Sequence, residues 1–361
     1  MNRFVHRFSL LPEAPPRSTA AATPRRGTDP GPTGVPVGLS RRRLIGGLWL
    51  GATGLPFAAM ALEPAQPTPL VGVLVSTGLH ALDYLRQGLR ERGFVEGQTV
   101  DFAFRSADGN PRDLPGLARH LAGLKPAVIF VAGPAALDAA VHATSTVPIV
   151  ALDLETDPLR SGLVRSVEQP RTNVTGVFLD QPGFAGRWFE LLRLVLPKAR
   201  RVNLLWDSST GPWQLAAAKA AAGRLGFEVD TLVVRDESEF DHALDSGMGR
   251  KPEALVLLSS PLVRARSKPI AEFCARQRLP AISPFVEFAQ AGGLMSYGPD
   301  VRDFYLRAAA FVDKVLKGSR ADDLPLSMPS KFQLVLNQRA AEPLGLVLPP
   351  ALLASANQVI R

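Results

Sequence analysis

Cysteine is almost missing from this chain of 361 residues, which has a single thiol at Cys274. One cysteine excludes a disulfide within the chain and any metal site built from several thiolates. The five histidines are scattered, and none has a second histidine or a glutamate at the helical spacing of metal ligands. The sequence therefore predicts no metal site.

Motifs of nucleotide-dependent and acyl-transfer enzymes are also lacking. No phosphate-binding loop ending in Gly-Lys-Ser or Gly-Lys-Thr occurs, and no Gly-x-Gly-x-x-Gly follows the first apolar run at 71–75. In the stretch 294–298, Leu294 occupies the place where a nucleophile elbow requires its first glycine. The sequence thus predicts no cofactor and favours binding over catalysis.

The net charge of +8 is concentrated at one end of the chain. Residues 1–60 contain eight arginines and two acidic residues, a net charge of +6, which leaves only +2 for the remaining 301 residues. A body so close to neutral argues against an extended phosphate-binding face, so we expect no nucleic-acid partner.

The first 61 residues look like an export leader. Residues 11–38 are rich in Pro, Gly, Thr, Ala and Arg without apolar periodicity, which predicts disorder. A triple arginine then precedes an apolar, glycine-interrupted run at 44–61 that ends in a small-x-small cleavage pattern. This resembles a twin-arginine export signal, with an ordinary secretory signal or an uncleaved anchor as alternatives. The residues that carry the signal are Arg41, Arg42, Ala59 and Ala61.

After a proline-rich spacer, strand-like and helix-like segments alternate. Short continuous apolar runs are typical of strands covered on both faces, and the segments between them have the 3.6-residue period of amphipathic helices. Such alternation predicts parallel strands joined by right-handed crossovers. We expect strands at 71–75, 99–104, 128–131 and 147–152, and helices at 82–89, 114–124 and 135–142.

The second half of the chain repeats the first loosely, at offsets of 126 to 133 residues. The segments 92–95, 125–130 and 147–149 have counterparts at 225–229, 251–256 and 279–282. Offsets of this size indicate two lobes of similar topology and not a solenoid of short repeats. Two α/β lobes joined by a few strands enclose a cleft that can close by hinge motion.

The stretch 279–318 has the pattern strand, turn, strand, polar loop, helix. Gly292-Gly293 separates the two strand-like runs, and the helix beyond Asp300 has an apolar stripe that includes Tyr305. Ligands of open α/β sheets bind beyond the carboxyl ends of the strands, so we expect Pro284, Phe285 and Tyr297 near the site.

The segments AGGLMSYGPD, RAAAFVDKVLKG, DLPLSMPSKFQLVLN and LGLVLPPALLASANQVI resemble the carboxyl half of a family of ABC-transporter substrate-binding proteins, some of which bind aromatic amino acids. The resemblance covers about residues 68–361. It implies a type I periplasmic binding protein fold: two doubly wound parallel-sheet α/β lobes with a ligand cleft between them. The first lobe would comprise 68–177 and about 300–326, and the second 178–299 and about 327–361.

The resemblance also implies partners and a location. We expect an exported periplasmic protein, a monomer, which captures a small organic solute by hinge closure and passes it to an ABC permease in the inner membrane. The family's glycine pair before Asn-Val-Thr-Gly is replaced here by residues 170–172, and the loop 153–155 is more acidic than in many relatives. The ligand therefore need not be tryptophan or tyrosine.

In the first lobe, three loops after strands provide candidate ligand contacts. Hydroxyl groups and a helix start are suited to a carboxylate, and the acidic loop is suited to an ammonium group. An amino acid or a related carboxylate is the expected type of ligand. The candidates are Ser76, Thr77, Gly133, Pro134, Ala135, Asp153 and Glu155.

The second lobe offers corresponding loops and aromatic side chains that provide apolar surface. The simpler alternative is that hydroxyls after strands cap helices, and that aromatic residues such as Phe285 fill the core. Trp188 and Phe189 follow helical spacing and are expected in the core. The second-lobe candidates are Asp207, Ser208, Ser259, Phe285 and Tyr297.

Two other functions remain open from the sequence. A periplasmic enzyme would use Asp153, Glu155 or Asp207 as acid and base, although no nucleophile or metal motif accompanies them. A sensory ligand-binding protein would share the two lobes, but the chain has no DNA-binding helix pair. The substrate-binding component of an ABC importer is the function that the sequence favours.

Overall fold

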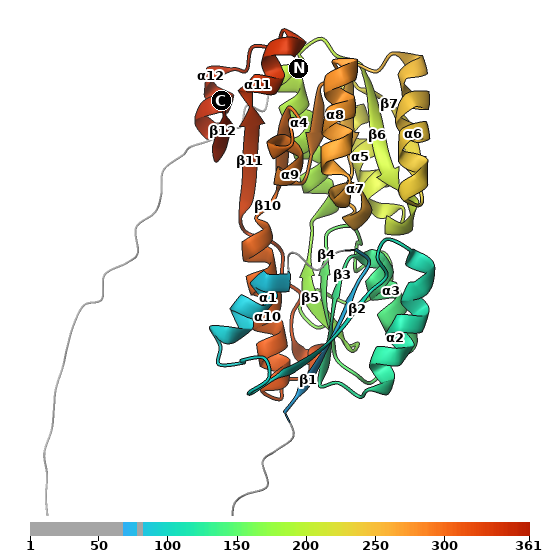
Figure 1. The fold of residues 1–361 in the computed structure, drawn as a ribbon, viewed down its shortest axis with the longest axis vertical. Helices are drawn as coiled ribbons and strands as arrows, with labels where there is room; N and C mark the ends of the chain where they lie inside the picture. Colours follow the sequence, from blue (N-terminus) through green and yellow to red (C-terminus); the bar gives the residue numbers. More distant parts are fainter. Residues whose placement is uncertain (1–67, 78–81) are drawn as a thin grey trace, which may run out of the picture. The chain divides into compact units, whose positions relative to one another are not determined.

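The computed structural model describes residues 68–77 and 82–361. All described residues belong to one compact unit. The predicted export-signal residues Arg41, Arg42, Ala59 and Ala61 lie outside the described residues. Within this unit, two sheets with helices on both faces form two lobes (Figure 1).

The first lobe contains a five-stranded sheet in the order β2-β1-β3-β4-β5, with every pairing parallel. Its central strands are buried on both faces, as their continuous apolar runs predict. The strands are β1 (Leu70–Val75), β2 (Asp101–Ser106), β3 (Val128–Ala132), β4 (Ile149–Asp153) and β5 (Val174–Phe178).

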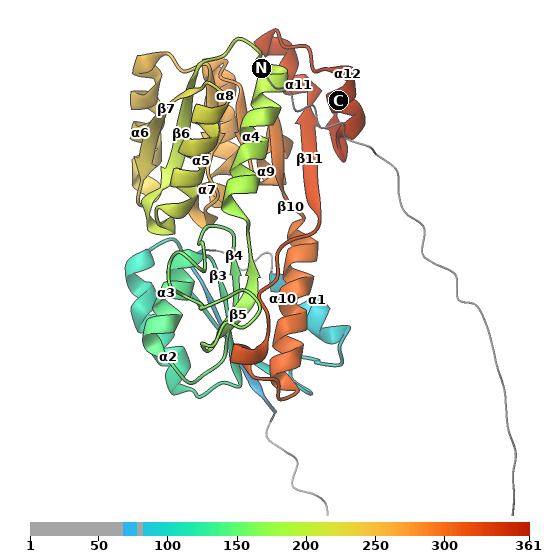
Figure 2. The same cartoon turned by 180° about the vertical axis from the view of Figure 1, so that it is seen from behind.

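Two pairs of helices cover this sheet. Helices α2 and α3 pack on one face, and α1 and α10 pack on the other (Figures 1 and 2). At the contact between α1 and α10, a Cβ on Gly88 would lie 2.6 Å from that of Ala309, so the close approach requires glycine. The helices are α1 (Leu82–Arg90), α2 (Leu114–Gly123), α3 (Pro134–Ala143) and α10 (Val301–Leu316).

The second lobe contains a seven-stranded sheet in the order β12-β11-β10-β9-β8-β6-β7. The pairings are parallel except that β11 runs antiparallel to β10. The strands are β6 (Arg201–Asp207), β7 (Glu228–Val234), β8 (Ala254–Leu257), β9 (Ala281–Ser283), β10 (Met295–Pro299), β11 (Phe332–Asn337) and β12 (Gln358–Ile360).

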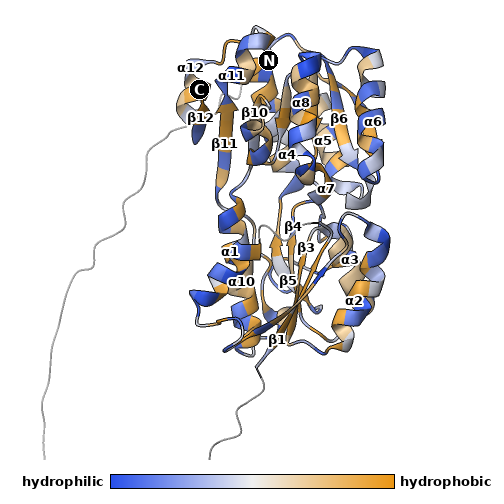
Figure 3. Cartoon of the chain, in the orientation of Figure 1, coloured by the Kyte–Doolittle hydropathy of each residue, from blue (hydrophilic) through white to orange (hydrophobic). Residues whose placement is uncertain are grey.

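Helices α4 and α5 cover one face of the second sheet, and α6 and α8 cover the other. Trp188 and Phe189 of α4 are fully buried, which confirms their expected place in the core. Figure 3 shows apolar residues along the strands and polar residues on the outer faces of helices such as α2 and α6. The helices are α4 (Gln181–Val195), α5 (Trp213–Arg224), α6 (Phe240–Gly247), α7 (Pro261–Ala265), α8 (Ser267–Gln277), α9 (Val286–Gln290), α11 (Gln338–Ala341) and α12 (Pro350–Ser355).

The described chain passes between the sheets three times. The links are β5 to α4, β10 to α10, and the segment that leads into β11. Ser327 in the last link pairs with the edge strand β5, because its N–H donates to Gly176 O and its carbonyl accepts from Phe178 N, both at 2.9 Å. Adjacent links of this kind are suited to a hinge.

The two-lobed α/β fold predicted from the sequence is confirmed. In the stretch 279–318, the expected turn is the short helix α9, and β10 returns parallel to β9. Position 298 in β10 requires glycine, because a Cβ there would lie 1.8 Å from Pro284 O.

Candidate functional site

A cavity of about 600 Å³ lies between the two lobes. Its size is typical of sites for small organic molecules. The first-lobe wall includes Thr77, Gly133, Leu154, Glu155, Phe304 and Tyr305, and the second-lobe wall includes Pro261, Arg264, Ala265, Lys268, Phe285 and Glu287.

Gly133 lets the two walls approach each other closely. It precedes α3 with φ +90°, a conformation that L side chains rarely adopt, and its N–H donates to Leu152 O at 3.0 Å. A Cβ at this position would lie 3.0 Å from Cγ of Pro261 in the other lobe. Glycine is therefore suited to both the backbone turn and the contact between the lobes.

Glu155 in the first-lobe wall joins the two lobes through a hydrogen bond. Its side chain is buried; Oε1 accepts from Ser259 Oγ of the second lobe at 2.5 Å, and Oε2 accepts from the Leu154 N–H at 3.2 Å. Burial, and then the nearby charge of Asp153, raises the pKa of Glu155 well above its ordinary value.

Asp153 lies next to Glu155 and organises the same loop. Its Oδ1 accepts from the N–H groups of Glu155 and Thr156, at 2.8 and 3.0 Å. Its Oδ2 is buried without a hydrogen-bond partner among the described residues, and burial raises the pKa of this carboxyl as well. Most hydrogen bonds to the two carboxylates of this loop therefore come from N–H groups of the loop itself.

Arg264 is the central charged group of the second-lobe wall. Its Nε and Nη2 both donate to Oε1 of Glu287, at 3.1 and 2.5 Å, and its guanidinium lies 5.6 Å from the ring centroid of Phe285. These contacts fix the orientation of the guanidinium at the cavity. Lys268, one turn further on, is exposed at the same wall.

Asp207 positions α7 and, through it, Arg264. Its Oδ2 accepts from Ser260 Oγ at 2.6 Å, and Ser260 Oγ in turn accepts from the N–H groups of Leu262 and Val263. Ser260 is thus the N-cap of α7, which places Arg264 one turn into the helix.

Helix α10 contributes aromatic residues to the first-lobe wall. Tyr305 is 7% exposed, and its ring lies 5.9 Å from that of Phe130 in the core. Burial raises the pKa of Tyr305; the positive charge of Arg264 opposes this rise and the negative charge of Glu155 adds to it. Charges on both walls therefore influence the pKa of the Tyr305 hydroxyl.

The first-lobe loops also border a second, much smaller hollow of about 20 Å³. Ser76, Pro134, Ala135 and Asp207 line it, and Thr77 lines both spaces. Ser76 Oγ is buried there without a partner among the described residues. A space of this size accommodates about one water molecule.

Comparison with known proteins decides the family. The model of the ABC transporter substrate binding protein family matches residues 72–360, most of the chain. The chain belongs to this family. The resemblance noted from the carboxyl-terminal segments is thereby confirmed.

Individual relatives agree with this assignment. A tyrosine-binding protein of Clostridioides difficile is 23% identical over 266 residues, which cover 72% of this chain and 75% of the relative. The structure of a conserved domain protein from Vibrio cholerae is 26% identical, with a TM-score of 0.75 and coverage of 81% and 99%. An ABC domain from Streptococcus pneumoniae in complex with L-Trp is 23% identical, with a TM-score of 0.74 and coverage of 81% and 100%.

The candidate residues are divided among several places in this substrate-binding fold. Thr77, Gly133, Glu155 and Phe285 line the cavity, and Ser76, Thr77, Pro134, Ala135 and Asp207 line the small hollow. Asp153, Ser208, Ser259 and Tyr297 line neither space, although Asp153 and Ser259 contact Glu155.

Ser208 and Tyr297 have structural contacts in the second lobe. Ser208 Oγ donates to Val234 O at 3.5 Å. The Tyr297 ring stacks on Phe332 at 5.7 Å, and its carbonyl accepts from Trp188 Nε1 at 2.9 Å, so the ring lies with α4 and not in the cavity.

Sequence reasoning did not select several cavity residues. Arg264, Lys268, Phe304 and Tyr305 lie on helices α7, α8 and α10, and only Tyr305 was noted, as part of an apolar stripe. The Ser260-Pro261 start of α7 was the available signal, because a capped helix at a strand end faces the cleft.

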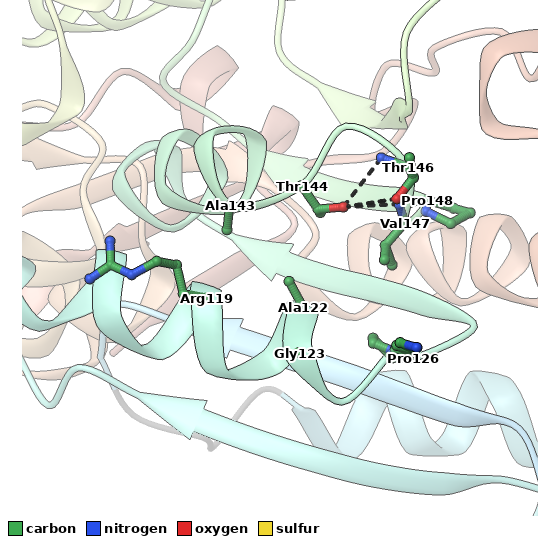
Figure 4. A pocket seen from close by; sticks show the side chains of 10 residues that line it. Arg119, Ala122, Gly123, Pro126, Ala143, Thr144, Thr146, Val147 and Pro148 are labelled. Carbon is green, nitrogen blue, oxygen red and sulfur yellow. Dashed lines mark hydrogen bonds between the residues drawn. The ribbon is translucent and has the colours of Figure 1, made fainter.

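A groove of about 580 Å³ lies elsewhere, within the first lobe (Figure 4). Arg119 and Lys125 border it, and the Thr144 hydroxyl accepts from the N–H groups of Thr146 and Val147 at 3.2 and 3.1 Å. Its polar groups thus support the local turn, and only one lobe contributes to it. Among residues 68–77 and 82–361, no helix is long and apolar enough to span a membrane.

Proposed function

We propose that the chain is the substrate-binding component of an ABC importer. It captures a small organic solute, an amino acid or a related carboxylate, in the cavity between its lobes. The lobes close on the solute by hinge motion, and the monomer delivers it to a permease in the inner membrane. Export to the periplasm depends on the twin-arginine-type signal around Arg41 and Arg42.

The observation that carries this proposal is a cavity of about 600 Å³ to which both lobes contribute. A ligand held by both walls stabilises the arrangement in which the walls are close. The Glu155–Ser259 hydrogen bond and the 3.5 Å contact from Thr77 Oγ1 to Pro261 O already join the lobes across the cleft. Both contacts would break on opening.

The proposed type of ligand draws support from the relatives. The protein from Clostridioides difficile is described as tyrosine-binding, and the domain from Streptococcus pneumoniae was crystallised with L-Trp. The apolar surface of Phe285, Phe304 and Leu154 suits a ligand with a ring or a hydrocarbon chain.

We propose that the protein binds its solute without altering it. The carboxylates of the cavity are engaged, Glu155 by Ser259 and Oε1 of Glu287 by Arg264, and Oε2 of Glu287 is buried without a partner among the described residues. A general acid or base needs a proton-transfer partner in the substrate, and these contacts would have to break first. Recovery of the bound solute with unchanged mass after prolonged incubation would agree with this role.

Native mass spectrometry of protein purified from its host tests the proposal, because a retained solute adds its mass to the complex. Thermal shift with the released solute should then raise the melting temperature by mass action. In Ala265→Trp the indole occupies cavity space, so affinity should fall at least about tenfold. Ala275→Trp, at an exposed position on α8 outside the cavity, is the matched control. Equal retention by the two variants would contradict binding in this cavity.

A further inference from the structure

We propose that the cavity binds an acid group of the solute with Arg264 and Tyr305, one from each lobe. The solute is then an apolar carboxylate whose affinity does not require an amino group. This inference rests on the proposed function and specifies the chemistry of the same cavity.

Arg264 has a hydrogen-bond donor to spare. Nε and Nη2 share a single oxygen of Glu287, and Nη1 makes no hydrogen bond among the described residues. The Glu287 carboxylate and the Phe285 ring hold the guanidinium in place before the ligand arrives. A preorganised guanidinium suits a carboxylate, and charge-assisted hydrogen bonds of this kind are about twice as strong as neutral ones.

Tyr305 supplies a second donor from the opposite lobe. Its side chain is more than nine-tenths buried and lines the cavity, and its hydroxyl makes no hydrogen bond among the described residues. Buried polar groups normally have partners, so a hydroxyl without a protein partner beside a cavity is available to a ligand atom. An acid group bonded to both Arg264 and Tyr305 would connect α7 of one lobe with α10 of the other, which couples recognition to closure.

Lys268 increases the positive charge at the same wall. It lines the cavity from α8, and no carboxylate of the described residues lies within 4 Å of its ammonium group. Its exposed position favours attraction of an anion towards the cavity over a fixed hydrogen bond.

The acidic side chains of the cavity have little capacity left for an ammonium group. Glu155 already accepts from Ser259 Oγ and the Leu154 N–H, and Oε1 of Glu287 accepts twice from Arg264. Oε2 of Glu287 has no hydrogen-bond partner among the described residues, but it is shielded from solvent and its carboxylate is paired with Arg264. Asp153, with its free oxygen, does not line the cavity. The donors left at the cavity, on Arg264, Lys268 and Tyr305, outnumber the acceptor left at Oε2 of Glu287, which favours an anion.

Four probes of one shape and different charge separate these possibilities. They are 3-phenylpropanoate, its neutral amide, 2-phenylethylamine and L-phenylalanine, and affinities are measured by isothermal titration calorimetry with the full chain. We expect the acid to bind at least about tenfold tighter than the amide, the usual effect of a hydrogen bond to a charged group. L-Phenylalanine should bind no tighter than the acid, and the amine should bind weakest.

Variants then locate the acid group. Arg264→Met should reduce the preference for acid over amide by about tenfold or more, and Tyr305→Phe, which removes only a hydroxyl, by about threefold to tenfold. Arg276→Met changes the net charge equally, at an exposed position on α8 outside the cavity, and should preserve the preference. Tyr305→Phe keeps the test informative if Arg264→Met fails to fold.

Three results would overturn the inference. They are tighter binding of the amine than of the acid, an acid preference equal in Arg264→Met, Tyr305→Phe and Arg276→Met, and no binding of any probe to the wild-type protein. If the solute retained from the host binds more weakly to Ala265→Trp than to the wild type, the proposed function stands although this inference fails. If that solute binds equally well to Ala265→Trp, the proposed function itself fails.

Discussion

The two walls of the cavity differ in how they use polar groups. On the first-lobe wall, the carboxylate of Glu155 is buried and engaged by Ser259 and a main-chain N–H. On the second-lobe wall, Arg264 and Lys268 retain donors beyond their contacts within the protein. The first wall therefore offers apolar surface and a link to the other lobe, and the second offers positive charge.

The difference follows from the elements that build each wall. The first-lobe wall is formed by loops at the ends of β1, β3 and β4, whose strands are buried on both faces, so its carboxylates are desolvated. The second-lobe wall comes from α7 and α8 at the lobe surface, where Arg and Lys keep water contact before closure. Desolvation favours the neutral form of these acids.

The largest expected effect concerns the apolar part of the first-lobe wall. Phe304→Ala removes a ring that is 2% exposed and lines the cavity. The free energy of unfolding should fall by about 3–5 kcal/mol, and affinity for 3-phenylpropanoate should fall at least about tenfold. Chemical denaturation and calorimetry measure the two quantities.

Phe311→Ala on the same helix separates these two effects. Phe311 is buried but does not line the cavity, so its removal should lower stability by a similar amount and leave affinity unchanged. Equal affinities of the two variants would show that the first-lobe wall adds no apolar contact to the ligand.

The next effect concerns the buried carboxyl of the first-lobe wall. Folding raises the pKa of Glu155, so between its ordinary value of 4.5 and the raised value the native state binds more protons than the unfolded chain. The contribution of Glu155 to stability must therefore fall as pH rises through that window. Glu155→Gln removes this penalty, so its melting temperature should exceed that of the wild type near neutral pH and the two should converge below pH 4.5.

The expected difference at neutral pH is a few degrees, since about 1 kcal/mol shifts the melting temperature by 2–4 °C in domains of 150–250 residues. Glu190→Gln, at an exposed carboxylate on α4, should not follow this trend. A melting-temperature difference between Glu155→Gln and wild type that is constant from pH 4 to 8 would contradict the assignment of the penalty to Glu155.

The fold could be predicted closely because its signals are local. The strand expected at 128–131 is β3 (Val128–Ala132), since a short apolar run between turn residues needs no knowledge of the rest of the chain. The sequence could also predict that three loop residues lie near the cavity, because parallel strands bring their carboxyl ends to one edge of the sheet. These residues are Thr77, Gly133 and Glu155.

To predict that Arg264 and Tyr305 line the cavity requires information that is not local. Each lies on a helix, and which face of that helix borders a cavity is decided by how the two lobes meet. For Tyr305, the apolar stripe correctly predicted burial of the side chain, but it gave no sign that the residue also lines the cavity. Tyr297 shows the converse, because it follows a strand-end rule yet its ring packs with Phe332 on the side of α4.

The smallest expected effect distinguishes the small hollow from the cavity. If Ser76 and the start of α3 held the carboxylate, as the sequence alone suggests, Ser76→Ala would weaken 3-phenylpropanoate at least about tenfold. Ser76 Oγ borders a space of about 20 Å³ and has no partner among the described residues, so its removal sacrifices no contact. We expect a change of less than about twofold by calorimetry, against about tenfold for Arg264→Met. A large loss in Ser76→Ala with Arg264→Met unaffected would place the acid group on the first lobe and reverse the roles of the two walls.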